Sequence, residues 1–326
     1  MKIKKNHAYA AIALVIIFAG ILFYLNYPGA KPVKNDGKNE TEKLLWFVDK
    51  NGYLYYPMDR GQVNFRKDNY SETGSLLISK VVYQSTRGNI YGILVLPKNI
   101  TEQLPGIILL PGAGVSKESE IRLAEKIAVL GAAVLTIDQR GVGETGGQIN
   151  SIKQDFLDFL NAKEPTQHLM VYDALRAYDL LYSAPFVDPD RIIIAGESLG
   201  GRIGIIAAAI DRNIRGVLAI SSAGLDFAMT NDTRVNSFLN SIDSDHYIGL
   251  MAPRKIVMMH NSYDKNVLLS SALGSFQKAQ EPKQFVLVND TSCNHGYCDS
   301  MYNGLVDALD YLVEIKAKTL VSIPDK

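Results

Sequence analysis

The chain has no excess of charge of one sign, no internal repeat and only two cysteines. Its 326 residues carry 34 Lys and Arg against 34 Asp and Glu, so no overall field favours nucleic acid or an acidic partner. Two cysteines permit at most one disulfide. No repeat or low-complexity tract is present, and a hydrophobic content of 47% is enough to fill one large core.

A long uncharged hydrophobic run occurs at the amino terminus, where eighteen residues from Ala8 to Leu25 carry no charge. As a helix rising about 1.5 Å per residue, this run would cover roughly 27 Å, close to the thickness of the bilayer core. We therefore predict a basic tail over residues 1–7 and a transmembrane anchor over residues 8–27 that contacts the lipid bilayer. A cleaved signal peptide is the alternative, but residues 28–30 form a poor cleavage site.

Lysines lie on both sides of this run, so the positive-inside rule does not decide its orientation. The tail is only a few residues long, and we expect it to stay inside. The large carboxyl-terminal part of the chain is then predicted to be extracytoplasmic.

Residues 28–43 are polar and contain Pro and Gly, which predicts a linker. An amino-terminal extension over residues 44–74 follows. Within it, residues 44–48 and 53–57 are predicted strands around a turn at Asn51 and Gly52, and no pattern assigns the stretch that ends at Glu72.

Buried strands alternate with helices over the main domain, residues 75–320. Two strands at its start form a predicted hairpin, and apolar runs separated by helical patterns follow. This alternation predicts a doubly wound, mostly parallel α/β sheet with an amino-terminal antiparallel hairpin. The predicted strands are 76–84, 90–96, 106–110, 132–137, 192–195, 216–220, 255–259 and 284–288; the predicted helices are 117–130, 152–160, 168–182, 199–210, 270–279 and 299–316.

One motif organises this pattern: Gly196-Glu197-Ser198-Leu199-Gly200, a G-x-S-x-G between a buried strand and a buried helix. A serine in such a sharp turn has a strained backbone, and only glycine-sized neighbours let strand and helix approach closely. The hydroxyl is lifted clear of the sheet. Ser198 is therefore the candidate nucleophile.

A serine nucleophile needs a base and an acid that orients the base. His295 lies in the loop after the last strand, and Asp264 lies in the loop after the strand before it. Loops past the carboxyl ends of parallel strands meet at one edge, where Ser198 is also expected. We predict His295 as the base and Asp264 as the acid, with Asp226 and Asp290 as rival acids.

An oxyanion also requires preformed donors. The amide of Leu199, directly after the nucleophile, is the natural first donor. The second is expected from the loop after strand 106–110, at Ala113 or, failing that, Gly114. The same loop could simply be a tight turn between a strand and a helix.

These motifs resemble those of the α/β-hydrolase superfamily over about residues 76–316. Arg191 to Gly201 matches the pattern D-x-x-R-I…G-x-S-x-G-G, and Asp138 opens a turn similar to D-x-R-G-x-G-x-S. The chain looks closest to dienelactone-hydrolase and acyl-peptidase-like esterases. It departs from the pattern at Pro111, where a histidine is common, and at Asn261, where glycine is usual. The amino-terminal region is too short for the β-propeller of the large peptidases.

The resemblance implies a serine hydrolase that acts on a small-molecule ester through an acyl-enzyme, with no metal or organic cofactor. Together with the predicted anchor over residues 8–27, it predicts a membrane-anchored serine hydrolase. A serine peptidase or a thioesterase is the alternative, and a non-catalytic ligand-binding relative is a further one. Residues 225–252 have the length of a small lid. Its large apolar side chains either shape an acyl pocket or pack as helix faces: Phe227, Met229, Phe238 and Tyr247.

Cys293 and Cys298 flank the candidate base. In an oxidising compartment a disulfide between them would pin the loop that carries His295. Two free thiols, or a metal site shared with His295, are the alternatives.

Overall fold

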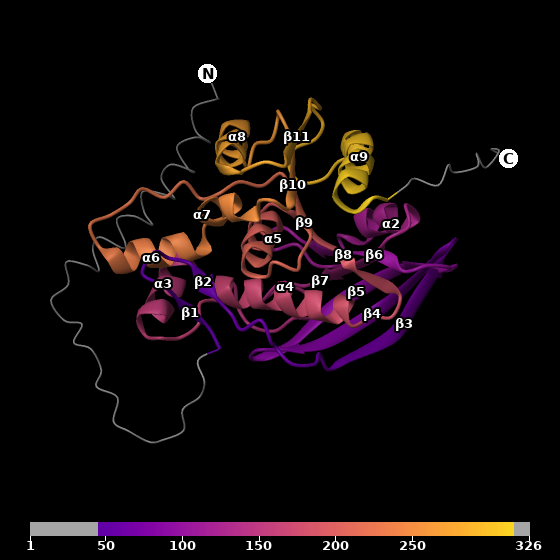
Figure 1. Cartoon of the computed structure of the whole chain (residues 1–326), viewed down its shortest axis with the longest axis horizontal. Coiled ribbons are helices and arrows are strands. Elements are labelled where there is room, and N and C mark those ends of the chain that lie inside the picture. Colours follow the sequence, from indigo (N-terminus) through magenta and orange to yellow (C-terminus); the bar gives the residue numbers. More distant parts are fainter. Residues whose placement is uncertain (1–44, 316–326) are drawn as a thin grey trace.

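The computed structural model describes residues 45–315 (Figure 1). The predicted tail, anchor and linker, residues 1–43, lie outside the described residues. Among the residues that are described, none of the helices has both the length and the apolar composition that a membrane crossing requires.

A nine-stranded sheet, ordered β11-β10-β9-β8-β6-β7-β5-β4-β3, forms the centre of the molecule. Strands β6 to β11 run parallel to one another. Strands β3, β4 and β5 form an antiparallel meander, and β5 joins it to the parallel strands by pairing antiparallel with β7. The predicted mostly parallel sheet with an amino-terminal hairpin is thereby confirmed. The strands are β3 (Phe65–Thr73), β4 (Leu76–Ser85), β5 (Gly88–Pro97), β6 (Leu104–Leu110), β7 (Ala133–Ile137), β8 (Val187–Glu197), β9 (Gly216–Ile220), β10 (Lys255–Asn261) and β11 (Lys283–Val288).

Helices cover both faces of the sheet (Figure 1). Side chains alternate along each strand, so Ile192 and Ile194 of β8 join one buried cluster while Ile193 and Ala195 join the other. The first cluster is closed by α4, α5 and α8, and the second by α2 and α9. The helices are α2 (Ile121–Val129), α3 (Ile152–Leu160), α4 (Thr166–Tyr182), α5 (Leu199–Ile210), α6 (Thr233–Ile242), α7 (Ser244–Tyr247), η1 (Ile248–Met251), α8 (Leu269–Lys278), η2 (Asp299–Met301) and α9 (Tyr302–Val313).

The amino-terminal extension packs onto the domain. The predicted hairpin is present as β1 (Phe47–Val48) and β2 (Leu54–Tyr55), and Trp46 lies beside the buried His168 ring of α4. The Tyr247 hydroxyl accepts a hydrogen bond from the Leu54 amide at 2.7 Å. These contacts tie the extension to the segment predicted as a lid.

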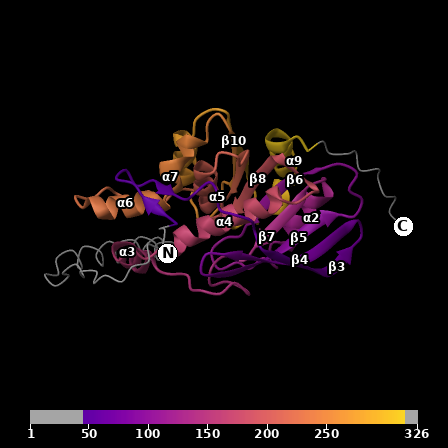
Figure 2. The ribbon, with the colours of Figure 1, turned by 60° about the horizontal axis from the view of Figure 1, so that its bottom comes forward.

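That segment, residues 225–252, contains α6, α7 and η1. Phe238 of α6 packs on Phe156 of α3, and both are buried. Figures 1 and 2 show α3 and α6 at one end of the molecule, opposite β3. Phe238 and Tyr247 therefore serve packing, whereas Met229 is 68% exposed.

The structure differs from several of the sequence predictions. The predicted helix over residues 299–316 is the short η2 followed by α9, which ends at Val313. Strand β3 was not predicted, because its side chains are mostly exposed at the sheet edge and show no apolar alternation. Helix α2 begins at Ile121 rather than at residue 117, because residues 116–121 form successive turns closed by hydrogen bonds between residues three apart.

Candidate active site

Ser198 lies in a tight turn between β8 and α5, with φ 51° and ψ −114°. A non-glycine residue rarely adopts a positive φ, and the surrounding chain enforces it here. A Cβ atom on Gly200 would lie 2.0 Å from the Leu110 carbonyl oxygen, and one on Gly196 would lie 2.4 Å from the Gly200 carbonyl carbon. Only glycine therefore allows α5 to begin this close to β6 and β8, which leaves Ser198 half-buried at the carboxyl edge of the sheet.

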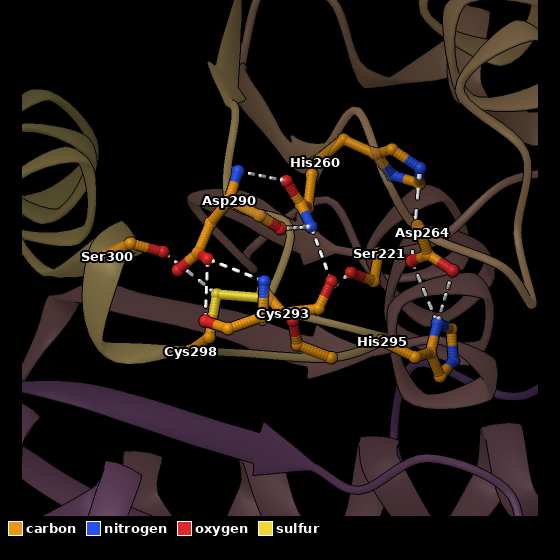
Figure 3. Close-up of a disulfide and its surroundings, with 11 residues drawn as sticks. Ser221, His260, Asp264, Asp290, Cys293, His295, Cys298 and Ser300 are labelled. Carbon is orange, nitrogen blue, oxygen red and sulfur yellow. Dashed lines mark hydrogen bonds and ion pairs between the residues drawn. A yellow bond between two sulfur atoms is a disulfide. The ribbon is translucent and has the colours of Figure 1, made fainter.

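Asp264 and His295 meet at the same edge. His295 Nδ1–H donates to both carboxylate oxygens of Asp264, at 3.0 and 2.9 Å (Figure 3). Asp264 also accepts hydrogen bonds at 2.9 Å from the amides of Asn266 and Val267. Burial acts to raise the pKa of Asp264, but these hydrogen bonds outweigh it and hold the pKa below its ordinary value. The carboxyl group is therefore ionised at neutral pH.

The rival acids do not contact His295. Asp290 bonds Ser292 within its own loop, and the exposed Asp226 lies 3.7 Å from the Lys278 ammonium. His260, at the end of β10, donates to the Val267 carbonyl at 3.0 Å, which is a structural role.

The loop that carries His295 also reaches the turn that carries Ser198. Ser221 Oγ donates to the Gly296 carbonyl at 3.2 Å, and a Cβ on Gly296 would lie 2.4 Å from Glu197 Oε2. Among the hydrogen bonds of residues 45–315, none joins Ser198 Oγ to His295. The structure thus brings the three residues to one edge and forms the acid–base link, while the nucleophile–base link is not made.

Cys293 and Cys298 are bonded to each other, which confirms the predicted disulfide (Figure 3). With both sulfurs in this bond, a thiolate metal site shared with His295 is excluded. In the part of the chain that is described, no three His, Cys, Asp or Glu side chains are grouped as metal ligands.

The two predicted oxyanion donors lie on adjoining segments. Leu199 is the first residue of α5, directly after Ser198. The loop after β6 passes the same point, since a Cβ on Gly112 would lie 3.7 Å from Ser198 Cβ, and the exposed Ala113 follows it. Gln139 Nε2 donates to the Pro111 carbonyl at 2.6 Å and holds the start of this loop.

The far end of the loop is held by a buried ion pair that the sequence analysis did not identify. The Lys117 ammonium lies 2.7 Å from Asp138 Oδ2, and both side chains are buried. The half-exposed carboxylates of Glu118 and Glu144 lie 2.7 and 3.0 Å from the same ammonium. The motif that begins at Asp138 could have indicated one partner, but no local pattern singles out Lys117.

A second unpredicted feature is a pair of carboxyl groups next to residues 289–298, the loop that carries His295 (hereafter the base loop). Glu120 and Glu197 line a cavity of about 380 Å³ beside Tyr297 and Cys298. Burial and the Glu197 charge raise the pKa of Glu120 to about 8. Burial also raises the pKa of Glu197. The hydrogen bond from the Tyr297 amide and the charge of His295 lower this pKa, but burial outweighs them.

Comparison with known proteins decides the family. The profile of the acetyl xylan esterase family (AXE1) matches residues 59–236, more than half of the chain. The chain belongs to the acetyl xylan esterase family. The predicted α/β-hydrolase assignment is confirmed. The match includes Ser198 and ends before Asp264 and His295.

The chain matches its curated relatives over less than two thirds of their length. The Bacillus subtilis (strain 168) protein YtaP, which carries the name of a hydrolase, is 35% identical over 92 residues, covering 28% of this chain and 30% of YtaP. The YfhR proteins of Escherichia coli O157:H7 and of strain K12 are 24% and 23% identical to this chain. The match covers 54% of this chain and 61% of each YfhR protein.

Solved structures show the same fold. The acetyl xylan esterase of Paenibacillus sp. R4 is 19% identical with a TM-score of 0.67, covering 78% of this chain and 90% of that one. Acetyl xylan esterase 1 of a Thermoanaerobacterium species is 16% identical with a TM-score of 0.63, covering 85% and 99%.

Proposed function

We propose that the protein hydrolyses short-chain carboxylic esters by two-step acyl transfer at Ser198. The observation that carries this proposal is the hydrogen-bonded pair of Asp264 and His295 at the sheet edge where Ser198 occupies its strained turn. Family membership supports an ester as the substrate, and an acetyl group on a sugar hydroxyl is the first candidate.

In the first step, Ser198 Oγ attacks the ester carbonyl carbon while its proton passes to Nε2 of His295. The serine–histidine hydrogen bond forms as the substrate binds, since such bonds often tighten only in the Michaelis complex. The ionised Asp264 stabilises the imidazolium through Nδ1. The amides of Leu199 and Ala113 stabilise the oxyanion.

Collapse of the tetrahedral intermediate breaks the bond to the alcohol oxygen, which takes the proton from His295. Water then attacks the acyl-enzyme with His295 again acting as base, and the carboxylic acid leaves. Ser198 regains its proton, so the atoms balance over one ester and one water.

The test compares Ser198→Ala with wild type on p-nitrophenyl acetate, longer-chain esters, peptides and thioesters. We expect kcat/KM for the acetate to fall at least about 10⁴-fold, because the nucleophile is removed. Ser183→Ala, at the end of α4, is the matched control and should retain wild-type activity. Unchanged hydrolysis by Ser198→Ala would refute the nucleophile, and faster turnover of thioesters or peptides would reassign the substrate class.

We further propose that residues 8–27 anchor the enzyme in a membrane with the hydrolase domain extracytoplasmic. The uncharged run supports the anchor, and the Cys293–Cys298 disulfide supports an oxidising compartment. Resistance to carbonate extraction, with protease access to the domain from the outside, is the expected result. Release of the intact chain by carbonate would overturn the anchor.

A further inference from the structure

The loop that carries His295 is held by a side chain at the end of β10. Asn261 is fully buried, and its Oδ1 accepts a hydrogen bond from the Asp290 amide at 3.0 Å. Its Nδ2 donates to the Asp290 carbonyl at 2.8 Å and to the Cys293 carbonyl at 2.6 Å. One side-chain amide therefore satisfies three backbone groups of the base loop.

The backbone of the same residue holds the acid. The Asn261 carbonyl accepts a hydrogen bond from the Asp264 amide at 3.0 Å, which closes the turn that carries the acid. The adjoining Ser262 amide donates to the Val288 carbonyl at 2.9 Å, where the base loop begins. Asn261 thus contacts both the segment that carries Asp264 and the segment that carries His295.

We propose that Asn261 is a positioning residue that sets the distance between Asp264 and His295; the inference rests on the proposed function of that pair. Donating to two carbonyls while accepting from an amide requires a short, planar side-chain amide. An aspartate of the same shape keeps the acceptor, loses both donors and directs negative charge at two carbonyl oxygens. An alanine leaves the Asp290 amide and the Cys293 carbonyl without these partners, and the Asp290 carbonyl keeps its hydrogen bond from the Cys293 amide at 3.2 Å.

The disulfide is a second restraint on the same loop. It joins Cys293, whose carbonyl Asn261 holds, to Cys298 on the other side of His295. With the disulfide intact, the loop stays attached when Asn261 is replaced, so the effect on the acid–base pair can be measured in a folded protein. The two restraints share Cys293. Removing both should therefore lower kcat by more than the product of the two separate reductions.

The experiment uses the full chain as wild type, Asn261→Asp and Asn261→Ala, each oxidised and reduced. Asn150→Ala is the control, because it removes two side-chain hydrogen bonds from a half-buried site at α3. The first readout is kcat and KM for p-nitrophenyl acetate. The second is the downfield proton resonance of the His295 Nδ1–H bonded to Asp264, assigned by its loss in His295→Gln.

We expect both Asn261 variants to lower kcat by about 10- to 100-fold with KM within about twofold, because misplacing a catalytic group by about 1 Å costs that much. The downfield resonance should broaden or disappear. Reduction should lower kcat further in the Asn261 variants than in wild type. Asn150→Ala should keep both the rate and the resonance.

Two results would overturn the proposal: a kcat within twofold of wild type with an unchanged resonance in Asn261→Asp, or an equal loss of rate and resonance in Asn150→Ala. Ser198→Ala separates this inference from the proposed function, since it should abolish activity and keep the resonance. If Ser198→Ala stays active, the proposed function fails, and the resonance in the Asn261 variants still decides whether Asn261 positions the pair.

Discussion

Replacing Lys117 by methionine tests whether the buried ion pair with Asp138 stabilises the loop that carries Ala113. Methionine retains most of the length and apolar volume of lysine but removes the charge. Asp138, which is completely buried, would then keep the backbone donors at Lys117 and Glu144, 2.8 Å away, with no cation beside it. The variant therefore isolates the charge interaction from packing.

The expected cost follows from the burial of each partner. Removing one member of a buried ion pair costs about 3–5 kcal/mol, because the remaining charge is left uncompensated. The contacts of Lys117 with Glu118 and Glu144 add little, since those carboxylates are 47% and 42% exposed and each such pair contributes about 0–1 kcal/mol. We expect Lys117→Met to lower the free energy of unfolding by about 3–5 kcal/mol.

Urea denaturation of the full chain measures this change through the transition midpoint at a constant m-value. Lys80→Met is the matched control, because Lys80 also pairs with Glu144 but at a partly exposed site, and it should cost at most about 1 kcal/mol. Adding Asp138→Asn to Lys117→Met should recover part of the stability by removing the unpaired charge. A Lys117→Met chain within about 1 kcal/mol of wild type would refute the reasoning.

Two further predictions concern the surroundings of Ser198. Since the pKa of Glu120 is raised from 4.5 to about 8, the unfolded chain releases this proton first, so wild type should lose stability relative to Glu120→Gln as pH rises from about 4.5 to 8. Thermal unfolding against pH measures this, with Glu125→Gln on α2, the helix that follows Glu120, as control; parallel curves for wild type and Glu120→Gln would contradict it. Gly200→Ala should cost about 3 kcal/mol and abolish ester hydrolysis, because its Cβ would lie 2.0 Å from a backbone oxygen. Gly274→Ala in α8, where nothing lies within 4 Å, should fold and hydrolyse esters as wild type does, and equal behaviour of the two variants would exclude the steric explanation.

Much of the fold and part of the site could be predicted from local pattern. The continuous apolar run at 216–220 coincides with β9, and the periodic apolar pattern at 152–160 coincides with α3. Both could be predicted because such patterns are formed by residues that are neighbours in the sequence. The turn at Ser198 was predictable for the same reason, since its glycines are adjacent in sequence. The parallel strands then required the loops with Asp264 and His295 to meet at one edge.

Only the tertiary structure decided how the side chains pair across that edge. It selected Asp264 over Asp226 and Asp290 as the partner of His295, and it placed Lys117 on Asp138. It also revealed the contacts between Asn261 and the base loop and the shared burial of Glu120 and Glu197. These contacts join residues 21 to 77 positions apart, taking Lys117 to Asp138 and Glu120 to Glu197 as the limits. Local periodicity records which face of an element is buried, but which polar groups share that burial depends on how distant elements pack together.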